Sequence, residues 1–337
     1  MRVIVPMAGR GSRLRPHTLI TPKPLVPIAG KTIVRRLLED IHSLLDRPIE
    51  EIAFIIGDFG VEAEIELHEI GRSLGANVRI FFQKEPLGTA HAIWQAAECI
   101  EGNTIIAFAD TLFKFPQNFQ LDVKKDGQIW VKTVEDPRNY GVVTLDEVGV
   151  IDQFVEKPEK FVSDLGILGI YYIKDGNLMK EKINYILEND IKDKGEYQFT
   201  TVLELMKKEG AAFYPAEVSE WMDCGNKQVL LETTRKILYF EQQEGNGLVS
   251  QDADISNSVI IPPCYIGPGV SIKDSVVGPF VSIEAKSELD QVVIKHSTVR
   301  SHAKVANSVL EKTLIGMHAS CLSVPSSWDM GDYSRIS

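Results

Sequence analysis

The strongest constraint on the fold is a repeat near the C-terminal end of the sequence. A motif of Asn or Asp, then Ser or Gln, then two aliphatic residues recurs four times, at spacings of 17, 16 and 17 residues. The four copies begin at Asn257, Asp274, Asp290 and Asn307. Aliphatic residues also recur every six positions within the copies, and Gly267, Gly269 and Gly278 mark corners. Three sides of about six residues make one coil, so the nested periods predict a short parallel β-helix over residues 251–325.

Strands and helices alternate in the sequence up to about residue 110. Buried parallel strands are expected at 2–6, 52–56, 78–82 and 104–109. Helical spacing of apolar residues is found at 32–45, 61–74 and 89–100. This alternation predicts a Rossmann-like α/β sheet, in which ligands bind at the carboxyl ends of the strands.

Beyond residue 110 the alternation stops and β segments follow one another closely. They lie at 128–134, 141–145, 150–156 and 165–173, and they predict an inserted antiparallel sub-sheet that makes the whole sheet mixed. Helices are expected at 176–189, 199–209 and 226–242, with a strand near 212–222. We therefore expect an α/β domain over 1–242, a linker over 243–250, the β-helix over 251–325 and a tail over 326–337.

Composition limits the class of protein. The chain has 337 residues, a formal net charge of −11 and 44% hydrophobic residues, which is ample for a sizeable core. Its four cysteines are scattered without a C-x-x-C pair, which favours reduced thiols in a cytoplasmic protein. The acidic balance disfavours a nucleic-acid partner. Short apolar runs and an N-terminus unlike a signal peptide predict no membrane partner.

The strand at 2–6 runs directly into a glycine-rich basic loop. Gly9 and Gly11 allow several backbone N–H groups to face one anion. The first 38 residues contain eight Lys or Arg and no Asp or Glu. The charged donors of the loop are Arg10, Arg13, Arg15 and Lys23. Such a segment in an acidic chain predicts a polyphosphate ligand, because guanidinium groups match phosphate oxygens.

Two other phosphate-binding motifs are excluded. Gly30-Lys31-Thr32 resembles the end of a P-loop, but Leu25 stands where the first glycine is needed. The dinucleotide motif G-x-G-x-x-G is also absent, because Leu14 stands where its third glycine would be.

Two carboxylates stand at the ends of predicted strands. Asp110 ends the apolar strand that begins at Thr104, and Asp223 ends a late strand. A carboxylate at the carboxyl end of a strand faces the ligand crevice. Singly, each Asp is more typical of a turn or a helix cap. As a pair beside a phosphate-binding loop, they predict a Mg²⁺ site.

Three further segments carry groups suited to a sugar or a base. Glu156 and Lys157 leave a strand together, and a carboxylate suits sugar hydroxyls while an ammonium suits a phosphate. Alone, the Glu156-Lys157 segment is more typical of a charged surface turn, and Tyr140-Gly141 is of similar standing. The amide of Gln83 and the backbone at Gly88 are suited to the edge of a base.

Together these segments resemble the sugar-1-phosphate nucleotidyltransferases over nearly the whole chain. The family signature G-x-G-[T]-R followed by a lysine matches Gly9 to Arg13 and Lys23, with Ser12 where Thr is usual. Other family blocks match Tyr140-Gly141-Val142, Glu156-Lys157-Pro158, Gly169-Ile170-Tyr171 and Trp221-Met222-Asp223-Cys224-Gly225. The block G-E-x-x-x-T-D is kept only in part, since Thr201 stands where Asp is common. Several branches of the family carry a short C-terminal left-handed β-helix.

The resemblance implies the reaction NTP + sugar 1-phosphate ⇌ NDP-sugar + pyrophosphate, with Mg²⁺ as the cofactor. The residues implied in catalysis are Arg13, Lys23, Asp110, Lys157 and Asp223, of which Asp110 and Asp223 are the metal ligands. Those implied in nucleotide binding are Ala8, Gly9, Gly11, Ser12, Arg13, Gln83, Pro86, Gly88 and Asp110. Those implied in binding the sugar phosphate are Tyr140, Gly141, Glu156, Lys157, Gly169, Tyr171 and Trp221.

The resemblance specifies the base and the sugar of the substrates less closely than it specifies the reaction. Gln83 with Pro86 to Gly88 resembles the thymidylyl and uridylyl branches, in which the Gly88 backbone could accept from the pyrimidine N3–H. We favour dTTP with glucose 1-phosphate, followed by UTP with a glucose or N-acetylglucosamine phosphate. The segment from Thr18 to Val26 also resembles guanylyltransferases that use mannose 1-phosphate.

Two alternatives from other functional classes are kept. The β-helix could carry out acyl transfer with His296, His302 or His318 as a base. The chain could instead be a non-catalytic regulatory subunit that binds a nucleotide sugar, although such a subunit is expected to lose loop arginines or a metal ligand. A short β-helix also makes a homo-oligomer plausible.

Overall fold

The computed structural model describes residues 1–9, 11–117 and 119–324, so the expected tail at 326–337 lies outside the described residues. The chain divides into two compact units. The sheet unit comprises Met1–Val26 and Thr32–Gly225, and the solenoid unit comprises Pro27–Lys31 and Asn226 onward. The division after Gly225 differs from the boundary expected after residue 242, because helix α6 (Lys227–Gln243) belongs to the solenoid unit.

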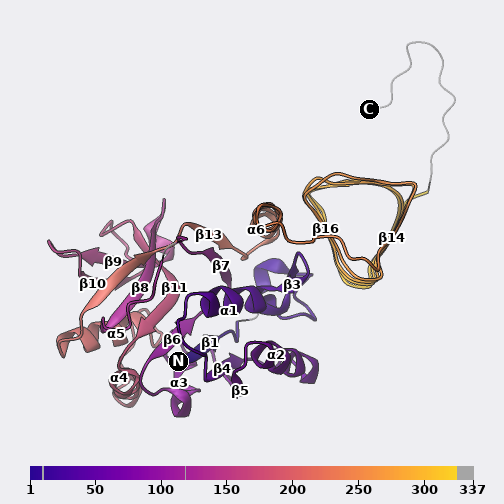
Figure 1. Cartoon of the computed structure of the whole chain (residues 1–337). Coiled ribbons are helices and arrows are strands. Elements are labelled where there is room, and N and C mark those ends of the chain that lie inside the picture. The colour runs from indigo at the N-terminus through magenta and orange to yellow at the C-terminus, as the bar shows by residue number, and fades with distance from the viewer. Residues whose placement is uncertain (10, 118, 325–337) are drawn as a thin grey trace. The chain divides into compact units, whose positions relative to one another are not determined.

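The sheet unit contains one mixed nine-stranded sheet (Figure 1). Four strands run parallel, as expected: β1 (Arg2–Pro6), β4 (Glu51–Ile56), β5 (Asn77–Phe82) and β6 (Thr104–Ala107). Strand β11 (Leu165–Ile173) pairs antiparallel with β6. The remaining strands are β8 (Gly127–Thr133), β9 (Gly141–Leu145), β10 (Ile151–Glu156) and β12 (Phe213–Glu217). The antiparallel segments therefore join the parallel strands in one sheet, which confirms the expected mixed sheet.

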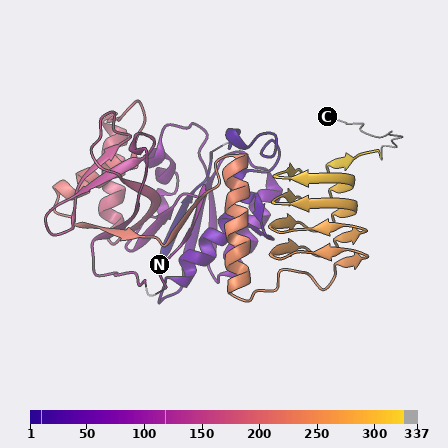
Figure 2. The same ribbon diagram turned by 90° about the horizontal axis from the view of Figure 1, so that it is seen from above.

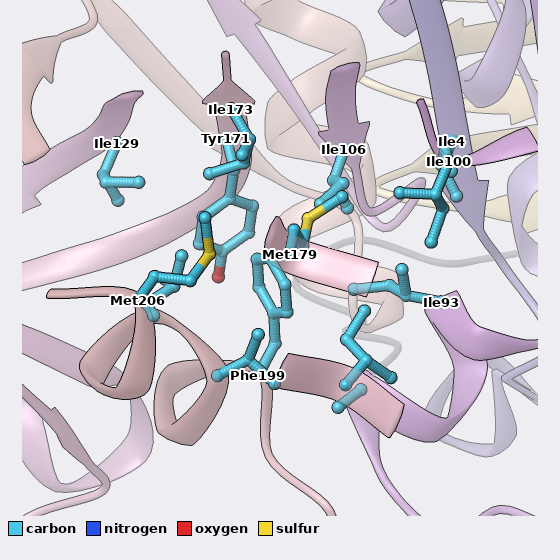
Figure 3. Packing of buried hydrophobic residues seen from close by; sticks show 14 of the residues in the cluster. Ile4, Ile93, Ile100, Ile106, Ile129, Tyr171, Ile173, Met179, Phe199 and Met206 are labelled. Atoms are coloured by element: carbon cyan, nitrogen blue, oxygen red, sulfur yellow. The ribbon is translucent and has the colours of Figure 1, made fainter. Parts of the chain in front are cut away.

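Helices cover this sheet and close its core. They are α1 (Ile33–Ser43), α2 (Val61–Ser73), α3 (Thr89–Trp94), α4 (Gly176–Glu188) and α5 (Phe199–Lys208). Helix α3 is shorter than the expected 89–100, and a 3₁₀ turn at Ala97–Cys99 follows it. Figure 3 shows Met179 of α4 and Phe199 of α5 packed near Tyr171 of β11 in the main hydrophobic cluster.

A small two-stranded ladder lies outside the main sheet. It pairs β7 (Thr111–Lys114), which the sequence did not predict, with β13 (Glu220–Asp223). The single strand expected near 212–222 is thus two strands in different sheets. The break falls at Ser219, whose backbone N–H and Oγ both donate to the Lys114 carbonyl at 2.9 Å.

The solenoid unit contains stacked parallel strands after α6 (Figure 2). The first stack is β14 (Asp254–Ser256), β17 (Ser271–Lys273), β20 (Glu288–Lys295), β22 (Lys304–Glu311) and β24 (Ser320–Leu322). The second is β15 (Val259–Ile260), β18 (Val276–Val277) and the later halves of β20 and β22. The third is β16 (Cys264–Ile266), β19 (Val281–Ile283), β21 (Thr298–Val299) and β23 (Leu314–Ile315). A short pair, β2 (Pro27–Ile28) with β3 (Lys31–Thr32), lies at the boundary between the units.

The repeat period is confirmed, but one copy of the motif starts a residue later than expected. Val276 pairs with Val293, so the third copy begins at Gln291, not at Asp290. Gln291 has φ +56°, matching +46° at Asn257 and +47° at Asp274, the first residues of earlier copies. The run of three aliphatic residues after Gln291 fits either register in the sequence, and only the left-handed corner distinguishes them.

The structure also bears on the expectations for the cysteines and for membrane-spanning helices. The four cysteines are free thiols, three of them buried. Over the described part of the chain, no helix combines the length and apolar character that crossing a membrane requires.

Candidate active site

The glycine-rich loop after β1 packs directly on Lys23. Gly11 has φ +60°, and a Cβ built on it would lie 2.8 Å from the Cβ of Lys23. The Thr18 hydroxyl donates to the Gly11 carbonyl at 2.7 Å and closes the loop. Only glycine fits this close approach without moving its neighbour. The loop therefore holds the Lys23 side chain, which is 7% exposed, beside it.

Residues from six segments of the sequence line one cavity of about 400 Å³ at the carboxyl ends of β1, β5 and β6. Every residue expected on the nucleotide side lines it: Ala8, Gly9, Gly11, Ser12, Arg13, Gln83, Pro86, Gly88 and Asp110. Lys23 and Gly225 line it as well. Arg10 lies outside the described residues. The cavity has the volume typical of a small-molecule site, and its cationic lining suits a polyphosphate.

The β7–β13 ladder brings the two carboxylates together. It places Asp223 opposite Thr111, the residue that follows Asp110. A Cβ built on Gly225 would lie 2.9 Å from Asp223 Oδ1 and 3.1 Å from Arg13 Nη2, so both charged groups contact the same backbone. Lys23 Nζ lies 3.9 Å from Asp110 Oδ2. Asp223 and Arg13 therefore both approach the cavity residue Gly225, and Lys23 lies near Asp110.

The environment of Asp110 favours binding of a cation. Burial among the cavity walls raises the pKa of the Asp110 carboxyl above its ordinary value, although 59% of its side chain remains accessible from the cavity. The Lys23 ammonium opposes this rise in pKa, and repulsion from Asp223 adds to it. A bound cation would relieve both the burial and the repulsion.

The donor set at this position fits Mg²⁺. This ion prefers oxygen ligands and is usually held by one or two carboxylates, with water and phosphate oxygens completing the shell. In the described ranges, no group of three or more His, Cys, Asp or Glu side chains could hold a metal ion.

The β9–β10 hairpin assembles the residues expected on the sugar side. It pairs Glu156 with Gly141, and the Lys157 N–H donates to the Tyr140 carbonyl at 3.0 Å. Glu156 Oε1 lies 3.6 Å from Lys157 Nζ, and Glu156 Oε2 accepts a hydrogen bond of 3.2 Å from the Thr200 hydroxyl. A carboxylate and an ammonium are therefore presented side by side, with the carboxylate oriented by Thr200.

Two aromatic residues connect this hairpin to the carboxylates. The rings of Tyr140 and Trp221 meet edge to face with centroids 5.7 Å apart, and Trp221 precedes Asp223 by two residues on β13. Burial raises the pKa of the Tyr140 hydroxyl, and the negative charge of Asp223 adds to that rise. The expected sugar side thus adjoins the Asp110–Asp223 pair.

Tyr171 and Gly169 are placed differently from the other residues expected on the sugar side. Tyr171 is 6% exposed and packs edge to face on Phe199 within the main hydrophobic cluster (Figure 3). Its burial raises the pKa of its hydroxyl. Gly169 has φ +81°, and its carbonyl accepts from the N–H of Phe108, a cavity residue. Both therefore support the site from the core.

The Gly88 carbonyl differs from the expectation that it accepts from a base. It already accepts from the Ala92 N–H at 3.0 Å and from Gln83 Nε2 at 3.3 Å. Since a carbonyl oxygen has two lone pairs, this arrangement leaves none for a pyrimidine N3–H. Gln83 Nε2 also lies 3.1 Å from His91 Nδ1, so the amide is held from two sides.

Sequence reasoning missed several residues that border or brace the site. Phe108, Ala109, Thr89 and Glu196 line the cavity. Thr89 Oγ1 accepts from the Phe199 N–H at 2.9 Å and ties α3 to α5. The partly matching segment from Gly195 to Thr201 was the available signal, since it contains both Glu196 and Thr200.

The chain is similar to several known proteins. A model of the nucleotidyl transferase family matches residues 2–239. Glucose-1-phosphate thymidylyltransferase of Streptomyces griseus is 26% identical over 99% of each chain. Mannose-1-phosphate guanylyltransferase catalytic subunit beta of Drosophila melanogaster is 31% identical over 80% of this chain and 71% of its own. A crystal structure of UDP-glucose pyrophosphorylase complexed with UDP-glucose shares the fold, with a TM-score of 0.57 and 22% identity, covering 72% of this chain and 98% of that one.

Proposed function

The chain belongs to the nucleotidyl transferase family, as a sugar-1-phosphate nucleotidyltransferase, and on this premise we propose that it converts dTTP and glucose 1-phosphate into dTDP-glucose and pyrophosphate. The observation that carries the proposal is that Arg13, Lys23 and Asp110 line a single cavity, with Asp223 beside the cavity residue Gly225. The similarity to the Streptomyces thymidylyltransferase over both full lengths supports the choice of dTTP and glucose 1-phosphate.

The nucleotide occupies the 400 Å³ cavity with its phosphates on the glycine-rich loop. Backbone N–H groups and Arg13 bind the β- and γ-phosphates, and Lys23 neutralises charge at the α-phosphate. Asp110 and Asp223 would hold Mg²⁺. Mg²⁺, when bound, neutralises charge on the α-phosphate.

The sugar phosphate binds at the β9–β10 hairpin. Lys157 contacts its phosphate, and Glu156, oriented by Thr200, accepts from sugar hydroxyls. A sugar phosphate oxygen attacks the α-phosphorus in line, a new P–O bond forms, and pyrophosphate leaves from the opposite side. The nucleophile is already ionised, so the protein needs no general base and contributes position and charge neutralisation.

A second substrate pair is GTP with mannose 1-phosphate. It is favoured by the 31% identity to the Drosophila guanylyltransferase subunit, which exceeds the 26% identity to the thymidylyltransferase. UTP with a glucose or N-acetylglucosamine phosphate is the third.

In this proposal the solenoid is a left-handed β-helix. We propose that it serves as an assembly module and not as an acyltransferase. His302 and His318 stack on each other with centroids 4.7 Å apart, and His296 stacks on Phe280 at 5.3 Å. Each ring occupies a left-handed corner against a neighbour, which is a structural use of a histidine. The cytoplasmic location expected from the sequence stays a prediction.

The test is pyrophosphate release with Mg²⁺, for dTTP, UTP, GTP, CTP and ATP each combined with glucose, mannose, galactose and N-acetylglucosamine 1-phosphates. We expect one dominant combination, dTTP with glucose 1-phosphate, and its loss in Asp110→Asn. A dominant GTP and mannose combination would replace the substrate assignment. No turnover in any combination, with nucleotide still bound, would favour the regulatory subunit, and acetyl-CoA binding would favour the acyltransferase.

A further inference from the structure

The side-chain amide of Gln83 has a defined orientation at the wall of the cavity that it lines. Its Nε2 lies 3.3 Å from the Gly88 carbonyl oxygen and 3.1 Å from Nδ1 of His91. The Gly88 carbonyl can only accept, and it is held in place by the Ala92 N–H, which donates to it at 3.0 Å. The amide atom that faces Gly88 is therefore the nitrogen, because the reverse orientation would bring two oxygens together.

The second contact of this amide constrains the ring of His91, on helix α3. Because Nε2 of Gln83 is a donor, Nδ1 of His91 has to accept from it and cannot carry a proton. His91 is half-buried, and burial lowers the pKa of its ring, while the charge of Glu85 opposes this fall. The ring is therefore neutral near neutral pH. A neutral ring has one proton, and the contact with Gln83 assigns that proton to Nε2.

A second amide, that of Gln95, competes for the same ring. Its Nε2 lies 3.2 Å from Nε2 of His91 and 3.1 Å from the His91 carbonyl oxygen. A neutral imidazole accepts at only one nitrogen, so only one of the two amides can donate to it. The His91 carbonyl belongs to the last turn of α3, where water can replace a side-chain donor, and Gln95 follows the end of that helix. Gln95 can therefore turn its oxygen toward the ring, whereas Gln83 is bound to the Gly88 carbonyl.

We propose that His91 is a positioning residue that keeps the oxygen of the Gln83 amide toward the base of the bound nucleotide. Gly88 and His91 use both hydrogens of Gln83 Nε2, which leaves Oε1 to face the base. An oxygen at this position accepts from a ring N–H, such as N3–H of thymine, and repels the unprotonated N3 of cytosine. This inference rests on the proposed nucleotide site, and it gives thymine N3–H an acceptor in place of the occupied Gly88 carbonyl.

The first test locates the proton on His91 by ¹⁵N NMR of the nucleotide-free, full-length protein near neutral pH. The signals of His91 are assigned by their loss in His91→Asn. We expect a protonated Nε2 and an unprotonated Nδ1. A ring that carries its proton mainly on Nδ1 would overturn the proposal. This measurement does not depend on which nucleotide or sugar phosphate is the substrate.

The second test compares the affinities for dTTP and dCTP by calorimetry in the presence of Mg²⁺. His91→Phe keeps a ring without an acceptor, and we expect the dTTP affinity to fall about fivefold, one net hydrogen bond, with no fall in the dCTP affinity. His91→Asn puts an acceptor near the position of Nδ1 and should recover most of the loss. Gln95→Leu is the matched control, because it removes the other amide on the ring and should change neither affinity.

Circular dichroism should show the same fold for all variants. The proposal is overturned if His91→Phe leaves the dTTP affinity unchanged, if it lowers both affinities equally, or if the wild type prefers a base without a ring N–H. If pyrophosphate release identifies GTP in place of dTTP, the same variants are compared with GTP and ATP, because guanine has N1–H where adenine has an unprotonated nitrogen. A wrong dTTP assignment is thereby distinguished from a wrong role for His91.

Discussion

The two units of this chain solve the same problem of burying apolar side chains in opposite ways. In the solenoid unit each coil repeats the previous one, and residues that pair are 16 or 17 positions apart. In the sheet unit the decisive pairs are remote, and Asp223 faces Thr111 across more than a hundred residues of sequence. Repetition builds a regular surface, whereas remote pairing builds a cavity that collects unlike groups. We therefore propose that catalysis takes place in the sheet unit.

The largest expected difference between the units is in the response to loss of a carboxylate. Asp110→Asn and Asp223→Asn should each lower kcat by about three orders of magnitude, because the metal supplies several kcal/mol of charge stabilisation. Asp290→Asn, at an exposed position of β20, should leave kcat unchanged. Steady-state pyrophosphate release with a circular dichroism check measures both, and near-wild-type turnover in the two site variants would remove the metal assignment.

Glycines with the same backbone conformation should also respond differently. Gly11→Ala puts a Cβ 2.8 Å from that of Lys23 at φ +60°, so we expect kcat/KM to fall about 10- to 100-fold as Lys23 is displaced. Gly269→Ala, at φ +64°, meets only the flexible Lys286 side chain at 3.4 Å. The equivalent corners already hold Lys286, His302 and His318 at similar φ, so this change should cost about 1 kcal/mol and no activity. Equal activity losses in the two variants would contradict this difference between the units.

Thr200 offers a smaller test of the sugar side. Thr200→Val removes the hydroxyl that donates to Glu156 at 3.2 Å. KM for the sugar 1-phosphate should rise about fivefold, the equivalent of one net hydrogen bond of about 1 kcal/mol, while KM for the nucleotide stays the same. Thr200→Ser should restore the wild-type value, and Thr201→Val serves as the neighbouring control. A rise in both KM values would mean that Thr200 supports the fold more than it orients Glu156.

The smallest effect concerns the protonation of Asp110. Burial and the charge of Asp223 raise the pKa of Asp110, so this carboxyl should take up its proton at a higher pH than an ordinary Asp as the pH falls. Asp223→Asn removes the repulsion and should move the pKa of Asp110 down, which ¹³C NMR titration of the metal-free protein can follow. An unchanged pKa would show that the two carboxylates do not interact.

The contrast between local and remote pairing also explains which features of the fold and the site could be predicted from the sequence. The solenoid period and most strands and helices are local patterns, and they were predictable to within a few residues. The residues predicted for the nucleotide side line the cavity because their motifs follow strand ends, whereas Phe108, Ala109, Thr89 and Glu196 were not predicted. The β7–β13 ladder and the donation from Thr200 to Glu156 depend on remote segments meeting. The one-residue slip at Gln291 arose because an aliphatic run is compatible with two registers.

The most direct test of the central claim is a ³¹P NMR mass balance of the reaction. The wild-type protein is incubated with Mg²⁺, one equivalent of dTTP and one of glucose 1-phosphate. We predict that both substrates decline together while a nucleoside diphosphate sugar and pyrophosphate appear in equal amounts. Consumption of the nucleotide to nucleoside diphosphate and phosphate, with the sugar phosphate left intact, would contradict the account.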